Sequence, residues 1–252
     1  MAAIYPDLAD KVVLVTGGAA GIGEFIVRAF AAQKAVVAFV DIQKDRGEKL
    51  AAELTAQSQR AHFAPVDVTD TAALQKTIGD FAAKLGPIGV LINNAAHDER
   101  HATDTVTSEY WDDRIAVNLK HQFFAAQAVL PGMKAAGGGS IINFGSTSWM
   151  IGQGGMAVYT AAKSAVLGLT RSMARDYGSF NIRVNTVAPG WIMTERQIEK
   201  WLTPEGEAEL MKRQCLKRRL QPAELAKFTL FLASDEASAC TNQNYIVDGG
   251  WV

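Results

Sequence analysis

The sequence is poor in cysteine, and this scarcity excludes several classes of protein. Only two cysteines, Cys215 and Cys240, occur in 252 residues, too few for a disulfide framework. Neither has the spacing of a metal ligand, so we expect no metal site. We interpret both as reduced thiols and expect a cytoplasmic location.

The sequence also has almost no net charge, since 25 basic side chains face 26 acidic ones. A chain without a basic field has little attraction for nucleic acid or anionic lipid. No stretch reaches the apolar length of a membrane-spanning helix, and the N-terminus lacks the pattern of a signal peptide. We therefore expect no nucleic-acid partner and no membrane partner.

Apolar residues are abundant at 48% of the chain, against 20% charged residues. A chain of this length and composition can bury a large core. We predict a single domain over residues 1–252.

Short apolar runs alternate with segments of helical periodicity. The predicted strands are residues 11–16, 36–40, 61–66, 90–92, 141–144, 182–188 and 245–247. The predicted helices are residues 24–34, 45–57, 71–85, 108–133, 156–172 and 222–233. Repeated strand–helix units predict an α/β fold with a doubly wound parallel sheet. Residues 191–220, which we call the flap, are rich in Glu, Lys, Arg and Met and predict a mobile helical cover over the sheet edge.

A glycine-rich turn follows the first predicted strand. The run Thr16-Gly-Gly-Ala-Ala-Gly-Ile-Gly23 opens a helix, so backbone N–H groups and the positive helix end can meet a pyrophosphate. Asp41 ends the second strand, where its carboxylate can bind ribose hydroxyls and repel a 2′-phosphate. Neither Ala20 nor Ile42 supplies a cation for such a phosphate, so we predict NAD as the cofactor. The alternative for Asp41 is a helix N-cap.

Three residues are suited to one proton transfer. Tyr159 and Lys163 lie four residues apart in a predicted helix and project from the same face. A nearby ammonium favours the phenolate, which makes Tyr159 a candidate general base. Ser146 follows the strand at Ile141 and can bind the same substrate oxygen. The alternative is an ordinary amphipathic helix, because this Tyr–Lys spacing occurs often by chance.

Further motifs complete a family pattern. With Asn93-Asn94-Ala95-Ala96, Asn118 and Pro189-Gly190 in this order, the sequence resembles the short-chain dehydrogenase/reductase family over essentially its whole length. The resemblance implies a Rossmann sheet and a catalytic quartet of Asn118, Ser146, Tyr159 and Lys163. The motifs and the resemblance together assign cofactor binding to Gly17, Ala20, Gly21, Ile22, Gly23, Asp41, Ile42, Asp67, Val68, Asn94, Ala95, Ala96, Tyr159, Lys163, Pro189, Gly190, Ile192 and Thr194.

The resemblance also implies a role for each member of the quartet. Tyr159 exchanges the proton, and Ser146 orients and polarises the substrate oxygen. Lys163 lowers the pKa of the tyrosine and holds the nicotinamide ribose, while Asn118 positions a water that relays protons. One departure is Ala96, where the family usually has glycine and where a methyl group narrows the site slightly.

Within the family, the sequence resembles the sugar 1-dehydrogenases that act on xylose, arabinose, galactose or fucose. The resemblance lies in residues 93–101, 143–149, 201–208, 214–217 and 248–251. A polyol needs directional hydrogen bonds, and indole faces can cover its C–H groups. We expect substrate contacts from His97, Glu99, Arg100, Ser146, Ser148, Trp149, Gln153, Tyr159, Trp191, Gln197 and Trp201. The alternatives are a solvated charged loop and tryptophans used only for packing, the role that we assign to Trp111.

Three functions are compatible with these motifs. The first is NAD-dependent oxidation of the anomeric hydroxyl of a free aldose pyranose to a lactone. The second is reduction or oxidation of another alcohol or keto substrate with NAD or NADP, for example by a 3-ketoacyl reductase. The third is a dinucleotide-binding protein without catalysis, although such a protein needs no phenolate. By resemblance we also expect a homotetramer built on helices 108–133 and 157–177.

Overall fold

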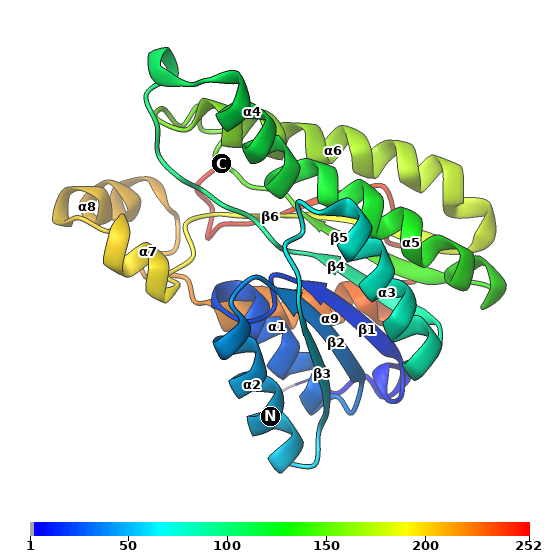
Figure 1. The fold of residues 1–252 in the computed structure, drawn as a ribbon. Coiled ribbons are helices and arrows are strands. Elements are labelled where there is room, and N and C mark those ends of the chain that lie inside the picture. Colours follow the sequence, from blue (N-terminus) through cyan, green and yellow to red (C-terminus); the bar gives the residue numbers. More distant parts are fainter. Residues whose placement is uncertain (1–2) are drawn as a thin grey trace.

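The computed structural model describes residues 3–252, which form a parallel sheet between two helical layers (Figure 1). Its strands are β1 (Val12–Thr16), β2 (Val36–Asp41), β3 (Arg60–Pro65), β4 (Ile88–Asn93), β5 (Gly139–Phe144), β6 (Ile182–Pro189) and β7 (Asn244–Val247). They lie in the order β3-β2-β1-β4-β5-β6-β7. The order reverses between β1 and β4, and ligands of open α/β sheets bind in the crevice outside such a reversal. The predicted fold class is confirmed.

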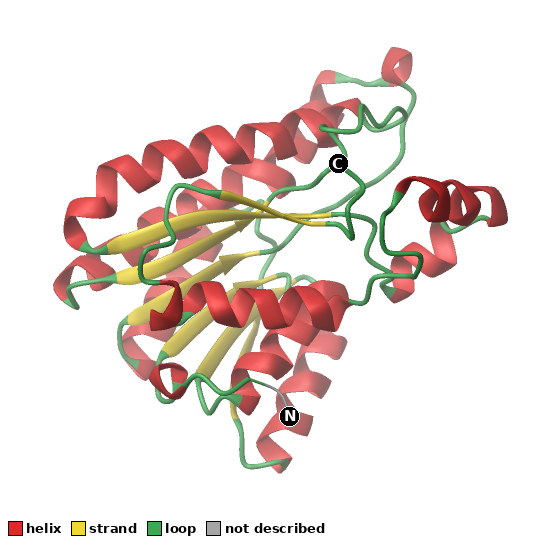
Figure 2. Cartoon of the chain, turned by 180° about the vertical axis from the view of Figure 1, so that it is seen from behind, coloured by secondary structure: helices red, strands yellow, loops and turns green. Residues whose placement is uncertain are grey.

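Helices cover both faces of this sheet (Figure 2). One layer contains α1 (Gly21–Ala32), α2 (Lys44–Ala56) and α9 (Pro222–Ala233), with α1 packed on α9. The other contains α3 (Thr71–Leu85), α5 (His121–Ala135) and α6 (Ala157–Tyr177), with α4 (Ser108–Ile115) packed against α6. Short 3-10 helices occur at Pro6–Leu8, Thr103–Thr105, Gly178–Phe180 and Asp235–Ala237. Because side chains of the central strands are buried on both sides, the sheet separates two apolar cores.

The single helix predicted over residues 108–133 is wrong. A π-helical segment, Ala116–Lys120, separates α4 from α5. At its end the His121 N–H reaches back five residues to the carbonyl of Ala116. The Asn118 side chain donates to the Arg114 carbonyl at 2.9 Å. A side-chain amide thus bonds to a backbone carbonyl at the point where the regular helical hydrogen bonds are interrupted. Such π-turns are frequent at functional sites, and this one contains Asn118.

The flap folds as two short helices, in agreement with its predicted helical character. They are α7 (Glu195–Lys200) and α8 (Pro204–Arg213), and both extend past the carboxyl ends of the strands (Figure 2). The hydroxyls of Thr194 and Thr203 cap them by accepting from backbone N–H groups. Within residues 3–252, no helix has the length and apolar character that crossing a bilayer would require.

The turn from β1 to α1 is closely packed. Gly17 has a φ of 67°, which favours glycine. A Cβ on Gly23 would lie 1.9 Å from the Gly17 carbonyl oxygen and 2.6 Å from Nδ2 of Asn94. That nitrogen donates to the carbonyls of Gly17 at 2.9 Å and Thr16 at 3.1 Å, which fixes the turn against the end of β4.

Gly23→Ala should therefore lower the free energy of unfolding by roughly 1–3 kcal/mol, because backbone atoms cannot move away from the added methyl. Gly79→Ala is the matched control, since a Cβ on this exposed residue of α3 would meet no atom within 4 Å. It should raise stability by about 0.5–1 kcal/mol. Urea unfolding measures both, and an equal effect of the two substitutions would contradict the close packing.

Candidate active site

Backbone groups at the start of α1 suit a pyrophosphate. The N-cap residue Ala20 offers no side-chain hydrogen bond to the first N–H groups of the helix, and these groups carry the positive end of the helix dipole. The missing side chains at Gly17 and Gly21 leave room for a phosphate to approach the turn. The residues present therefore fit a dinucleotide.

The Asp41 carboxylate joins the glycine turn to the beginning of α2. It is only 7% exposed and accepts from the N–H of Ala19 at 3.0 Å and of Gln43 at 2.9 Å. The alternative role as a helix N-cap is wrong, because the N-cap of α2 is Gln43. Asp41 instead lines a cavity of about 600 Å³ that we call the cofactor cavity.

A second cavity of about 480 Å³, the substrate cavity, adjoins the first. Ile22, Asn94, Ala96, Thr194 and Arg196 line both. Of the predicted cofactor residues, the cofactor cavity also contains Gly17, Ala20, Gly21, Asp41, Ile42, Asp67, Val68 and Ala95, and the substrate cavity contains Tyr159, Lys163, Pro189, Gly190 and Ile192. Gly23 lines neither cavity and serves the packing of the turn.

A cation that the sequence reasoning overlooked also lines the cofactor cavity. Arg46, in the first turn of α2, shares this lining with Asp41 and Ile42. Its guanidinium forms an ion pair with Glu195 of the flap at 2.8 Å. Ala20 and Ile42 supply no cation, but Arg46 brings one to the same cavity.

Ser146, Tyr159 and Lys163 meet in the substrate cavity, as predicted. Tyr159 is half-buried at the cavity wall, and desolvation raises the pKa of its hydroxyl, with a smaller contribution in the same direction from Asp98. A hydrogen bond with Ser146 and the charge of Arg100 oppose the increase. Burial lowers the pKa of Lys163 to about 7.

The expected lowering of the Tyr159 pKa by Lys163 is therefore not the dominant effect. The Lys163 Nζ donates to the Phe144 carbonyl at 2.8 Å and lies 5.8 Å from the centre of the Tyr159 ring. Desolvation acts on both groups and favours the neutral form of each. A phenolate at Tyr159 needs further compensation beyond this lysine.

Asn118 is buried and lines neither cavity. Its side chain accepts from the His97 N–H at 2.9 Å and donates to the His97 carbonyl at 3.1 Å. Its main-chain carbonyl accepts from the Gln122 side chain at 3.3 Å. In this structure Asn118 fixes the loop that follows β4, and its expected part in a water relay stays a prediction.

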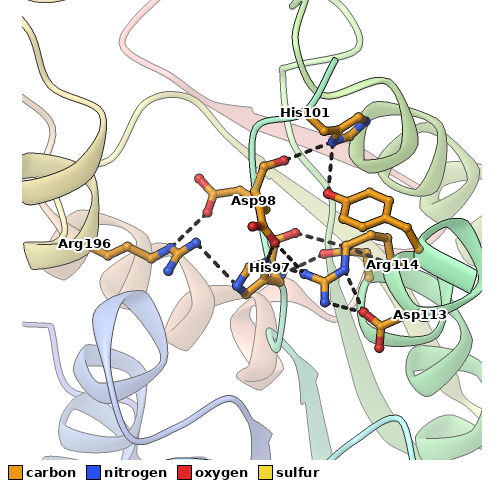
Figure 3. Close-up of polar contacts among 9 residues, drawn as sticks. His97, Asp98, His101, Asp113, Arg114 and Arg196 are labelled. Carbon is orange, nitrogen blue, oxygen red and sulfur yellow. Dashed lines mark hydrogen bonds and ion pairs between the residues drawn. The ribbon is translucent and has the colours of Figure 1, made fainter. Parts of the chain in front are cut away.

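The loop after β4 binds the flap through Asp98 (Figure 3). One carboxylate oxygen accepts from Nε of Arg196 at 3.1 Å and the other from Nε2 of Gln197 at 2.6 Å. Gln197 in turn accepts from the indole N–H of Trp191 at 2.8 Å. The chain of contacts connects the loop to the beginning of α7.

His97 lies between two guanidinium groups in the same network (Figure 3). Its Nδ1 contacts Arg114 at 2.5 Å and its Nε2 lies 3.5 Å from Arg196. Burial is the main cause that lowers its pKa, and both arginines act in the same direction. A neutral imidazole has one acceptor nitrogen, so His97 accepts from Arg114 at the shorter contact.

The predicted substrate residues separate into two groups. Glu99 and Trp149 line neither cavity, and His97 lines only the cofactor cavity. Glu99 instead pairs with Arg114 at 3.5 Å. The substrate cavity contains Arg100, Ser146, Ser148, Gln153, Tyr159, Trp191, Gln197 and Trp201.

Asp98, Arg196 and Trp251 also line the substrate cavity and were missing from the predicted set. Asp98 stood in the charged loop after the fourth strand, and Trp251 in the run Asp248-Gly-Gly-Trp251, so both had a signal. Arg196 had none.

Three polar groups of the cavity wall have no partner among the described residues. They are the indole nitrogens of Trp201 and Trp251 and the hydroxyl of Ser148, all of them buried. A buried donor without a partner is costly, and in this conformation the three atoms are not accessible from the cavity. The Arg100 guanidinium covers the Trp201 ring at 5.1 Å, which fixes one wall of the cavity.

Comparisons with known proteins agree with this architecture. A family model described as enoyl-(acyl carrier protein) reductase matches residues 17–252. The chain is 46% identical to a D-xylose 1-dehydrogenase of Caulobacter vibrioides over 99% of this chain and 98% of that protein. It is 47% identical to a probable galactose dehydrogenase of Rhizobium meliloti (strain 1021), over 98% and 96% of the two chains.

Solved structures are similar over nearly the whole chain. A short-chain dehydrogenase/reductase from Serratia marcescens has a TM-score of 0.90 and 34% identity, covering 97% of this chain and 99% of its own. A blue fluorescent protein from a metagenomic library, in complex with NADPH, has a TM-score of 0.90 and 32% identity over 98% and 99% of the two chains. The chain belongs to the short-chain dehydrogenase/reductase family and is an oxidoreductase, which confirms the expectation from the motifs.

Lys163→Met should change how stability depends on pH in the protein without cofactor. The pKa of folded Lys163 is about 7, below that of an unfolded lysine, so folding releases a proton between these values. The wild-type free energy of unfolding should therefore rise with pH relative to the variant, by about 1 kcal/mol per pH unit between about pH 7 and 9.

Urea titrations of both proteins across this range measure the difference. The raised pKa of Tyr159 acts only above its unfolded value of 10.0 and leaves this window unaffected. A difference between the two proteins that does not change with pH would show that Lys163 keeps its charge on folding.

Proposed function

We propose that the protein oxidises the C1 hydroxyl of a free aldose pyranose to the aldonolactone, with NAD as the hydride acceptor. The observation that carries this proposal is the position of Tyr159 and Lys163 in a cavity whose wall also contains the polar side chains of Asp98, Arg100 and Gln153. The names of the two relatives, a xylose and a galactose dehydrogenase, support the same substrate class. Water then opens the lactone to the aldonic acid.

Three residues of the substrate cavity have separate roles in the proposed reaction. Tyr159, as phenolate, takes the proton of the C1 hydroxyl, and Ser146 donates a hydrogen bond to the same oxygen as negative charge develops. Lys163, with its pKa near 7, accepts or returns a proton at neutral pH. When bound, the nicotinamide supplies the acceptor for the C1 hydride.

The choice of NAD rests on Asp41. Its buried carboxylate lines the cofactor cavity, where a ribose diol can bind it and a 2′-phosphate meets its negative charge. The NADPH bound to one structural relative shows that this fold also accepts the phosphorylated cofactor. The preference therefore depends on particular residues of this chain.

A second candidate function follows from the description of the matching family model. A reductase of acyl substrates would use the same Tyr159 and Lys163. The substrate cavity favours a sugar, because Asp98, Arg100 and Gln153 in its wall would lose solvent against an acyl chain without gaining partners. A binding protein without catalysis would not need Tyr159 beside Lys163 in the cavity.

We also propose an oligomeric state and a cellular location for the protein. Trp111 of α4 and Phe123 of α5 are 44% and 43% exposed, and Trp111 lines neither cavity, so its assignment to packing rather than to a substrate contact stays a prediction. We propose that these residues lie in the interface of a homotetramer built on α4, α5 and α6. Cys215 and Cys240 are free thiols, which suits the reducing cytoplasm.

Tyr159→Phe should reduce the rate of NADH formation with xylose or galactose by about 10²–10⁴-fold, because it removes the proton acceptor and keeps the ring. NAD binding, measured by calorimetry, should persist. Tyr177→Phe at the other end of α6 is the control and should retain the wild-type rate. Wild-type turnover by Tyr159→Phe would place the proton acceptor elsewhere.

Asp98→Asn should raise KM for the sugar by roughly tenfold or more, since hydrogen bonds to charged groups contribute about 1.5–3 kcal/mol. It should also shift the pH profile of kcat to lower pH, because the Asp98 charge raises the pKa of Tyr159. Glu99→Gln neutralises the neighbouring carboxylate, which lines neither cavity. Equal kinetics of the two variants would argue against a sugar contact at Asp98.

A further inference from the structure

The adenosine end of the cofactor cavity contains charges of both signs. Asp41 and Arg46 line the same cavity, one at the end of β2 and the other in the first turn of α2. A guanidinium is a strong bidentate ligand for phosphate. A free Arg46 guanidinium would bind a 2′-phosphate. Its attraction would offset part of the repulsion between that phosphate and Asp41.

Glu195 of the flap occupies that guanidinium. Its carboxylate accepts from Nη2 of Arg46 at 2.8 Å, although 149 positions separate the two residues in the sequence. The hydrogen bond to Glu195 is the main cause that raises the pKa of Arg46, and Glu24 and Glu199 add smaller contributions of the same sign. The negative charges of three carboxylates, one on α1 and two on α7, therefore act on one guanidinium.

The pair is too exposed to be explained by stability. The side chains of Arg46 and Glu195 are 52% and 61% exposed, and ion pairs of this kind contribute little to folding. Their position matters more, because both residues line the cofactor cavity and join α2 to the flap across it. An exposed pair can still change the local potential for an incoming dianion.

We propose that Glu195 is a cofactor-specificity residue that disfavours NADP by holding the Arg46 guanidinium in an ion pair at the adenosine end of the cavity. The inference rests on the proposed use of NAD and extends it from Asp41 to the flap. Asp41 would bind the ribose from the end of β2, where the N–H groups of Ala19 and Gln43 fix its carboxylate. Glu195 acts from a separate element, by removing the cation that a 2′-phosphate would need.

Binding titrations of NAD and NADP without sugar test this proposal. In Glu195→Gln, the affinity for NADP should rise roughly three- to tenfold, as expected when one charge a few ångströms from a dianion is removed in a solvated site. The affinity for NAD should change by less than about twofold. Glu199→Gln is the matched control on the same helix, because Glu199 lines the same cavity and forms no ion pair with Arg46 among the described residues.

The double variant Arg46→Ala/Glu195→Gln assigns the effect to the pair. It should lose the gain in NADP affinity seen in Glu195→Gln. An equal gain in Glu199→Gln, or a gain that persists without Arg46, would overturn the role of the ion pair. A Glu195→Gln variant that binds NADP no better, in a protein that prefers NAD, would overturn this inference alone, whereas tighter binding of NADP by the wild type would overturn the proposed use of NAD as well.

Discussion

The desolvation of Tyr159 and Lys163 at the wall of the substrate cavity is the constraint on which the rest of the site depends. Burial raises the pKa of the phenol and lowers that of the ammonium to about 7, so both groups tend towards their neutral forms. The active phenolate therefore requires donors and positive charge around it. The hydrogen bond with Ser146 and the positive charge of Arg100 lower the pKa of Tyr159. Lys163, whose pKa is about 7, can accept or release a proton at neutral pH without a large change in free energy.

Asp98 connects this acid–base pair to the flap. Its charge raises the pKa values of Tyr159 and Lys163, and each of its oxygens accepts from a side chain of α7. A movement of α7 would change the solvation of the carboxylate and, through it, the proton affinity of both groups. The position of α7 and the proton affinity of Tyr159 and Lys163 are coupled through Asp98 in this way.

Sequence patterns predicted the elements whose structure is decided locally. The buried strands, the turn at Gly17 and the Tyr159–Lys163 face follow from spacing alone, and the motif order predicted their convergence with Ser146. Asp98 and Glu99 could not be separated in this way, since they are neighbours with similar chemistry. Only contacts with α7, 98 and 99 positions further along the chain, turn Asp98 into the cavity. The role of Arg46 could not be predicted because its partner Glu195 lies 149 positions further along the chain. The π-helical segment could not be predicted because it depends on an unusual hydrogen bond between residues five positions apart.

The most direct test of the account follows one hydrogen atom. Xylose and galactose carrying deuterium at C1 would be incubated with the protein and NAD, and the reduced cofactor and the sugar product would be analysed by mass spectrometry. The account predicts that the deuterium appears in the reduced nicotinamide and that the product is the lactone or its aldonic acid. Reduced cofactor without deuterium, or a product that keeps the label at C1, would contradict oxidation at the anomeric carbon.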